Sequence, residues 1–204
     1  MQQDLTDRND SNKTQERNKA KDPNEPNWYA LRVFYNHILR IKEELEQHGH
    51  KTYMAVKKVR ETVNGRTVER QVQLVPSLLF VRCTQDELLN FKGDHYNELM
   101  LYRCADSTDP APIDEEEMRL FILVTSVTDG QDVAILGPDK HSFDFRPGDR
   151  VRVLEGPFKG AEGVIKRIKK DRKLLVAVRG VVIVAVSHIP AAYLEKTNKT
   201  NQVI

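Results

Sequence analysis

The sequence has few cysteines and no long apolar stretch. Its 204 residues include two cysteines, Cys83 and Cys104, and no Cys-x-x-Cys pair. We therefore expect neither a disulfide framework nor a cysteine-ligated zinc site. No run of about eighteen apolar residues is present to span a bilayer, and the first residues lack the basic start and apolar stretch of a signal peptide. We expect a cytoplasmic protein with reduced thiols and no membrane partner.

Signatures of catalysis are also missing. The six histidines are scattered, and the pair His48 and His50 has no cysteine or acidic partner at ligand spacing. The sequence contains no P-loop, dinucleotide-binding fingerprint or nucleophile elbow. We therefore expect a protein without enzymatic activity, metal or cofactor.

Apolar residues are rare at the start of the chain. Residues 1–26 contain only Met1, Leu5 and Ala20 as apolar residues, so this segment cannot bury enough surface to offset its ordering entropy. We expect a disordered N-terminal tail over residues 1–26 and a short C-terminal tail over residues 197–204.

The net charge of +2 conceals an uneven distribution. Residues 27–128 carry thirteen basic and fifteen acidic residues, whereas residues 144–196 carry twelve basic and six acidic residues. The excess of positive charge in the C-terminal part indicates a partner there with phosphates or acidic groups.

Regular structure is expected to begin at residues 28–34, where a run of aromatic and branched residues predicts a strand. Apolar residues at Ile38, Ile41 and Leu45 then recur at helical spacing, and Gly49 ends the pattern. A strand over residues 51–56 follows. Asn64-Gly65 is a strong signal for a type I′ hairpin, whose charged arms, residues 57–63 and 66–73, are expected to project from the body.

The pattern continues with a short apolar strand at residues 78–81 and a capping box, Thr84-x-x-Glu87, that opens a second helix. Another strand over residues 99–102 precedes a third helix capped by Asp114. The resulting order, β-α-β-β-α-β-α, predicts an α+β, ferredoxin-like domain over residues 27–128, with an antiparallel sheet and helices on one face.

Residues 129–143 lack periodicity and contain glycine and proline, so we interpret them as an interdomain linker. The pattern then changes to short strands and turns, which predicts a small closed barrel over residues 144–196. The expected strands are Arg150–Leu154, Gly163–Ile168, Leu174–Arg179 and Val181–Val186. The last two are dominated by β-branched residues, which favour strands over helices.

The strongest motif runs from Pro147-Gly148-Asp149 through Gly156-Pro157-Phe158-Lys159-Gly160 to Gly163. Valines alternate with arginines between residues 150 and 153, which gives one core face and one basic face. This segment resembles a KOW motif in an SH3-like barrel. Phe158 lies at a loop tip, where it is either a plug over the end of the barrel core or a contact for a partner.

A second segment, residues 74–81, reads Leu-Val-Pro-Ser-Leu-Leu-Phe-Val and resembles the Phe-Pro-Gly-Tyr segment of the NusG family of transcription factors. Trp28-Tyr29 and Pro110-Ala111-Pro112-Ile113 match the same family, and the resemblance covers residues 28–196. Val75 and Leu78 replace the usual aromatic residues. With the long tail, these departures resemble specialised paralogues, such as RfaH or the UpxY regulators of capsular polysaccharide operons.

The resemblance implies a monomeric transcription elongation or antitermination factor. Its NusG N-terminal (NGN) domain would bind the clamp helices of RNA polymerase, reach the gate loop opposite and promote processive transcription of a specific operon. The apolar patch implied for this contact comprises Leu74, Val75, Pro76, Leu78 and Phe80. An ordinary place in the core of the sheet is the alternative for these residues, above all for Phe80.

The resemblance also implies nucleic-acid contacts. In specialised paralogues the first helix can contact the non-template DNA strand, and Arg40 occupies a matching basic position with Arg32 and Lys42 nearby; a solvated helix face is the alternative. The expected partner contacts of the barrel are Phe158, Lys166, Arg167, Lys169 and Lys170; a merely solvated turn is the alternative for residues 169–173. Nascent RNA, a ribosomal protein and a termination factor all remain open as partners of the barrel.

One alternative function is left open by these patterns. KOW motifs also occur in RNA-binding proteins of the translation machinery, which would need no apolar polymerase patch. Such proteins are usually far more basic than this chain, whose net charge is +2.

Overall fold

The computed structural model describes most of the chain between residues 24 and 197. The described ranges are 24–104, 107–126, 133–136, 150–168, 171–178, 180–187 and 189–197. The expected N-terminal and C-terminal tails lie almost entirely outside them. Within these ranges, every helix is too short or too polar to cross a membrane.

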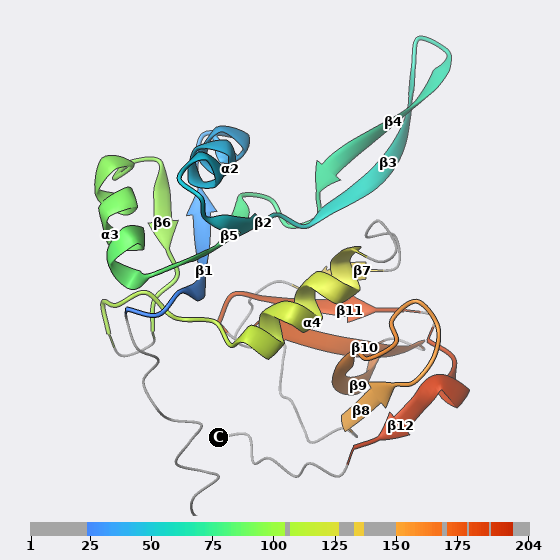
Figure 1. Cartoon of the computed structure of the whole chain (residues 1–204). Helices are drawn as coiled ribbons and strands as arrows, with labels where there is room; N and C mark the ends of the chain where they lie inside the picture. Colours follow the sequence, from blue (N-terminus) through green and yellow to red (C-terminus); the bar gives the residue numbers. More distant parts are fainter. Residues whose placement is uncertain are drawn as a thin grey trace, which may run out of the picture.

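The first part of the chain forms a four-stranded antiparallel sheet in the order β2-β5-β1-β6 (Figure 1). Its strands are β1 (Asn27–Val33), β2 (Lys51–Tyr53), β5 (Leu78–Cys83) and β6 (Leu99–Leu101). Its helices are α2 (Ile38–Gln47), α3 (Gln85–Asp94) and α4 (Glu115–Ser126). The element order confirms the predicted ferredoxin-like domain.

The two faces of this sheet have different cover. Leu79 and Val81 of β5 belong to one buried cluster with the apolar residues of α2 and α3, whereas Leu78 and Phe80 belong to a second cluster with those of α4. Successive side chains of a strand point to opposite faces, so α4 covers the face that α2 and α3 leave open. The expectation of helices on one face only is therefore wrong for α4.

Local signals mark the ends of the helices as the sequence predicts. Gly49 follows α2 with φ of +83°, a conformation that residues with a Cβ rarely adopt. At the start of α3, the Glu87 backbone N–H donates to the Thr84 hydroxyl over 3.3 Å, and the Thr84 backbone N–H donates to the Glu87 carboxylate over 2.8 Å. This reciprocal pair is the predicted capping box.

A long β-ribbon extends away from the sheet (Figure 1). It consists of β3 (Val56–Val63) and β4 (Arg66–Gln73), which pair along their whole length and form a two-stranded sheet of their own. Asn64 and Gly65 connect them with φ of 52° and 75°, the positive values that a type I′ turn requires at both positions. The predicted hairpin is confirmed.

The second part of the chain forms a six-stranded antiparallel sheet in the order β12-β8-β9-β10-β11-β7. The strands are β7 (Val133–Leu136), β8 (Arg150–Val153), β9 (Glu162–Ile168), β10 (Asp171–Val178), β11 (Val182–Val186) and β12 (Leu194–Lys196), with a short 3-10 helix, η2 (Ala191–Tyr193), before the last. Residues 174–178 and 182–186 are strands, as their β-branched residues predict.

One strand departs from the sequence-based division of the chain. Residues 133–136, which were expected in a linker without regular structure, form β7 and pair with β11. Val133 lies opposite Val186, and Leu136 lies opposite Ile183. The four-residue run Val-Ala-Ile-Leu is too short to show a period by itself. It becomes a strand because the edge of β11 offers it backbone partners.

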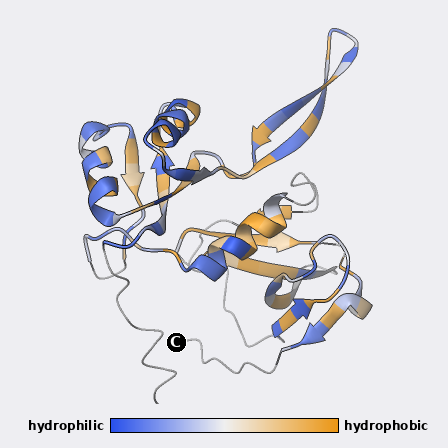
Figure 2. Ribbon diagram, in the orientation of Figure 1, coloured by the Kyte–Doolittle hydropathy of each residue, from blue (hydrophilic) through white to orange (hydrophobic). Residues whose placement is uncertain are grey.

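Helix α4 joins the two parts of the protein. It packs against β10 of the second sheet as well as against β1 of the first, and Figure 2 shows a largely hydrophobic helix between the two sheets. Met118, Phe121 and Val124 are buried, while Leu120 and Leu123 are half-buried against the same cluster. A helix that is apolar around most of its circumference needs cover on more than one side, and here the two sheets provide it.

Candidate functional site

The predicted polymerase patch divides into buried and accessible residues. Leu74, Leu78 and Phe80 expose 7%, 4% and 1% of their surface, whereas Val75 is half-buried and Pro76 is exposed. The ring centroids of Phe80 and Phe121 of α4 are 5.2 Å apart. The expectation of an exposed sheet face is therefore wrong for Leu74, Leu78 and Phe80, because the apolar side of α4 completes a core over this face.

The loop that carries Val75 and Pro76 has a fixed shape. The Val33 backbone N–H donates to the carbonyl of Ser77 over 2.8 Å, and the Ser77 backbone N–H donates to the side-chain oxygen of Gln73 over 2.9 Å. Ser77 itself has φ of 64°, a left-handed conformation that costs energy for a residue with a Cβ. These bonds present Val75 and Pro76 at one end of the sheet.

Two further accessible side chains lie beside this loop. Arg32 of β1 pairs with Leu78 of β5 on one side and with Met100 of β6 on the other. Arg32 is exposed, and Met100 has 44% of its surface exposed. We call Arg32, Val75, Pro76 and Met100 the sheet-end surface.

Met100 was not predicted as part of a site. Its sequence signal is weak, because an apolar residue in a run such as Leu99-Met100-Leu101 has the same pattern as a fully buried strand. Only the pairing of β6 with β1 shows that the exposed Met100 lies directly beside the exposed Arg32.

The predicted DNA-contacting residues have different surroundings. Lys42 donates to both oxygens of Glu46 over 2.7 Å, and Arg40 donates to Glu44 over 3.4 Å and to Glu98. Within the part of the chain that the structure describes, no ion pair is found for Arg32. Of the three, Arg32 is therefore the one for which the described residues supply no carboxylate partner.

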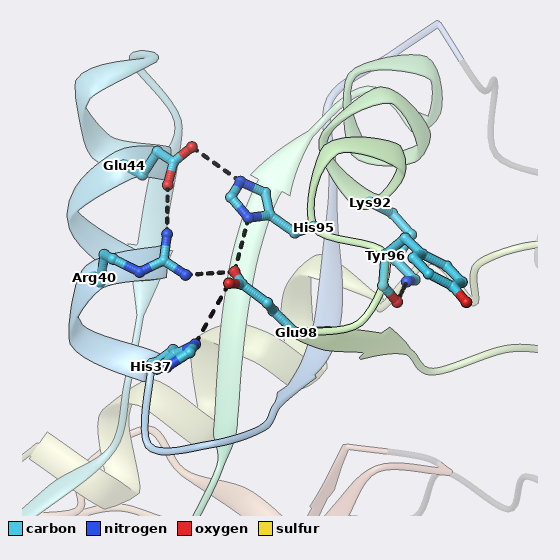
Figure 3. A network of polar contacts seen from close by, with 7 residues as sticks. All are labelled: His37, Arg40, Glu44, Lys92, His95, Tyr96 and Glu98. Carbon is cyan, nitrogen blue, oxygen red and sulfur yellow. Dashed lines mark hydrogen bonds and ion pairs between the residues drawn. The ribbon is translucent and has the colours of Figure 1, made fainter.

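Arg40 belongs to a network that links α2 to the segment before β6 (Figure 3). The largely buried His95 ring lies 2.9 Å from Glu44 through Nε2 and 3.0 Å from Glu98 through Nδ1. His37 Nδ1 lies 3.6 Å from Glu98. Hydrogen bonds, first from His95 and then from Arg40, hold the pKa of Glu98 below its usual value.

This network was not visible in the sequence. Glu98 is 58 residues from Arg40, and His95 is 51 residues from Glu44. Only the folding of α2 beside the end of α3 brings these residues together. The network gives Arg40 a structural role, and its guanidinium is already engaged by two carboxylates.

In the barrel, Phe158 is a core residue with 5% of its surface exposed. Gly156 and Gly160 have φ of 82° and 87°, and the Gly160 backbone N–H donates to the Val153 carbonyl over 2.8 Å. This bond folds the loop back over the end of the barrel. Of the two arrangements left open for Phe158, the plug is therefore the one observed, and a contact with a partner stays a prediction.

A pocket lies beside the buried Phe158 ring. It is also lined by Val153, Pro157, Ile189, Pro190 and Tyr193. Its wall is mainly apolar and comes from the loop after β8 and from the segment before β12. Such a pocket can receive an apolar side chain of another protein.

The predicted basic cluster of the barrel can be located only in part. Strand β9 pairs with β10 so that Lys166 lies opposite Lys173 and Arg167 opposite Arg172. The side chains of Lys166 and Arg167 lie outside what the structure describes, as do Lys169 and Lys170 entirely. The register alone concentrates four basic residues on one pair of strands.

Other reactive groups form no site among the described residues. They include no group of three or more His, Cys, Asp or Glu residues that could hold a metal ion. Cys83 is buried, and this burial raises the pKa of its thiol to about 12. Cys104 is exposed.

Comparisons with known proteins agree with the two-part architecture. Residues 26–122 match the family described as transcription termination factor nusG, and residues 147–184 match the KOW motif. The chain is 26% identical to the transcription termination/antitermination protein NusG of Synechocystis over 82% of this chain and 87% of the relative. It is 23% identical to NusG of Borreliella burgdorferi over 72% of this chain and 85% of the relative.

The chain is also similar to solved structures. The structure titled "Domain interaction in Thermotoga maritima NusG" is 24% identical, covers 86% of this chain and 99% of its own, and aligns with a TM-score of 0.42. The NusG N-terminal domain and the KOW motif thus follow one another in this chain as two matched regions, and its curated relatives bear the name NusG. The chain belongs to the NusG family of transcription termination/antitermination factors.

Proposed function

We propose that this protein binds RNA polymerase through its N-terminal domain and promotes processive transcription of a specific operon, such as a capsular polysaccharide locus. The observation that carries the proposal is the sheet-end surface, where Val75, Pro76 and Met100 place apolar groups on a rigid edge. Exposed apolar groups held by a rigid scaffold are typical of protein interfaces. The family resemblance implies that the clamp helices and the gate loop are the parts of RNA polymerase that this surface contacts. A cytoplasmic location follows from this role.

Nucleic-acid contact in this proposal centres on Arg32. Arg40 and Lys42 are held by carboxylates of α2 and of the segment before β6, so each would have to give up an ion pair to reach a phosphate. Arg32 is exposed beside Met100. In this proposal Arg32 contacts a phosphate of the non-template strand, for which it has to give up no ion pair found among the described residues.

The barrel has a separate role in the proposal. The apolar pocket beside Phe158 favours a protein partner, such as a ribosomal protein or a termination factor. The basic residues paired between β9 and β10 favour phosphates of nascent RNA. These two surfaces involve different residues, so substitutions in each separate the two partners.

The test of polymerase binding uses the full-length protein and purified RNA polymerase core enzyme. Val75→Asp and Met100→Asp are each expected to weaken binding by about tenfold or more, as loss of an interface anchor does. Leu89→Asp, on the exposed side of α3, is the matched control and should bind like the wild type. Circular dichroism and thermal unfolding check that each variant is folded. Equal affinity of all three variants would contradict the proposed surface.

Operon specificity requires a second experiment. Mapping the positions of the protein on the genome during growth is expected to show it concentrated over one transcription unit. A uniform distribution over transcribed genes would contradict an operon-specific role and indicate a general elongation factor.

A further inference from the structure

The β3–β4 ribbon has two chemically different faces. Directly paired residues share a face, and residues alternate between faces along each strand. One face, which we call the valine face, places four of the five valines of the ribbon opposite charged residues. Its pairs are Val59 with Arg70, Val63 with Arg66, Val68 with Glu61, and Val72 with Lys57.

The opposite face carries one valine, Val56, opposite Gln73 at the base of the ribbon, and is polar beyond it. Its pairs are Lys58 with Gln71, Arg60 with Glu69, and Thr62 with Thr67. Four of the five valines therefore lie on one side, in a zigzag line along the ribbon. A random scatter of apolar residues would not produce this segregation, which is the pattern of a strand pair with one face meant for burial.

Among the residues that the structure describes, none buries the outer part of the valine face. Residues 60–71 are all exposed, and Val63 and Val68 expose 51% and 48% of their surface. A two-stranded hairpin without further cover is only marginally stable in water. A partner that covers the valines would remove this apolar surface from water and stabilise the ribbon.

The charges on the valine face indicate the chemistry of that partner. Lys57, Arg66 and Arg70 flank the valines with a single acidic residue, Glu61, which lies 3.3 Å from Arg70. An apolar line with excess positive charge on its flanks complements an amphipathic segment with an apolar seam and acidic flanks. Nucleic acid fits less well, because a phosphate backbone would leave the valines without apolar contacts.

The position of the ribbon indicates where such a segment comes from. Strand β4 ends at Gln73, and the next residues of the chain include Val75 and Pro76 of the sheet-end surface. With eight residues in each strand and a rise of about 3.3 Å per residue, the ribbon reaches roughly 25 Å beyond that loop. A large partner seated on the sheet-end surface therefore lies within reach of the valine face.

We propose that the valine face is a second docking surface for RNA polymerase and receives an acidic amphipathic segment of the enzyme. This inference rests on the proposed function, because it takes the polymerase as the partner already bound at the sheet-end surface. The contact with polymerase then extends from the sheet-end surface along the ribbon, which projects from the body of the domain. Its four valines supply the apolar contact, and Lys57, Arg66 and Arg70 set the charge preference.

The experiment measures the affinity of the full-length protein for RNA polymerase core enzyme. The double variant Val63→Ser with Val68→Ser removes apolar groups from exposed positions, and its control is Thr62→Ala with Thr67→Ala on the opposite face. We expect the valine variant to bind about tenfold more weakly and the threonine variant to bind like the wild type. Because all four side chains are exposed, the fold should persist, and circular dichroism checks that it does.

A second pair of variants tests the charge preference. Arg66→Gln on the valine face and Gln71→Glu on the polar face each lower the net charge by one. Arg66→Gln should weaken binding several-fold, whereas Gln71→Glu should leave it unchanged. An equal loss for both, with the valine variant unaffected, would indicate general electrostatic attraction of the kind that nucleic acid produces, and would overturn the inference.

The remaining outcomes are also decisive. Unchanged binding of the valine variant, in a wild-type protein that binds polymerase, would overturn the valine face while leaving the sheet-end surface intact. Failure of the wild type itself to bind polymerase would overturn the proposed function, and this inference with it. The affinity of the wild type for polymerase therefore distinguishes the two failures.

Discussion

Phe80 of β5 and Phe121 of α4 lie with their ring centroids 5.2 Å apart and their planes at 54°. Both side chains are buried, and Tyr53 of β2 approaches Phe121 edge-on at 6.1 Å. This aromatic contact attaches α4 to the sheet. It is the reason that Phe80 is a core residue.

The first prediction concerns this contact. Phe121→Ala should lower the free energy of unfolding by about 3–5 kcal/mol, because it removes a fully buried ring and leaves a cavity between two layers. Urea unfolding followed by the fluorescence of Trp28, the only tryptophan and a member of the same buried cluster, measures the change. Ser126→Ala, at the exposed end of α4, should change stability by less than about 0.5 kcal/mol. Similar losses for both variants would contradict a specific role for the ring.

A second prediction concerns the close approach of β9 and β10. A Cβ added at Gly163 would lie 2.2 Å from the carbonyl oxygen of Leu175, so Gly163→Ala must push the two backbones apart. We expect a loss of about 3 kcal/mol, at the upper end for overpacking, in thermal unfolding of the barrel. Gly93→Ala in α3 meets no atom within 4 Å and should instead stabilise by about 0.5–1 kcal/mol. A neutral effect of Gly163→Ala would show that the strands are not packed this closely.

The third prediction separates the two thiols. Burial raises the pKa of Cys83 to about 12, so at pH 8 this thiol is protonated as well as inaccessible, whereas Cys104 is exposed. Since the thiolate is the reactive form, a disulfide reagent should titrate one thiol in the native protein and both in denaturant. Cys104→Ser should abolish the native reaction. Rapid reaction of that variant under native conditions would contradict the burial of Cys83.

The fourth prediction concerns the network around Glu98. Hydrogen bonds from His95 and Arg40 hold the pKa of Glu98 below its ordinary value of 4.5. The ionised carboxylate therefore stabilises the folded protein above that value, and this stabilisation is lost as the pH falls below it. Nuclear magnetic resonance titration should show the carboxyl carbon of Glu98 changing at lower pH than in an unfolded peptide.

Arg40→Gln provides the matching test of this network. It removes one of the two donors to Glu98, so the pKa of Glu98 should rise toward 4.5 while remaining lowered by His95. Glu43→Gln, on the exposed side of α2, is the control and should leave that pKa unchanged. The same titration curve for wild type and Arg40→Gln would show that Arg40 does not pair with Glu98 in solution.

Patterns that involve neighbours along the chain were predicted from the sequence with good accuracy. The Asn64-Gly65 turn, the Thr84–Glu87 capping box and the strands of residues 174–186 all depend on local backbone preferences. These preferences act over a few residues, so a short stretch of sequence is enough to recognise them. The ferredoxin-like order followed from joining such local elements in sequence.

Where a side chain ends up was decided by contacts between distant segments. The same apolar pattern in β5 fits an exposed patch or a core, and the arrival of α4 with Phe121 makes it core. Arg40 carries the same charge whether it meets DNA or Glu98, and the packing of α2 beside the end of α3 supplies Glu98. Phe158 fits a partner contact as well as a plug until the loop folds over the barrel. The sequence determined the elements because their causes are local; only the tertiary structure decided which faces are buried, because burial depends on segments that the chain brings together from far apart.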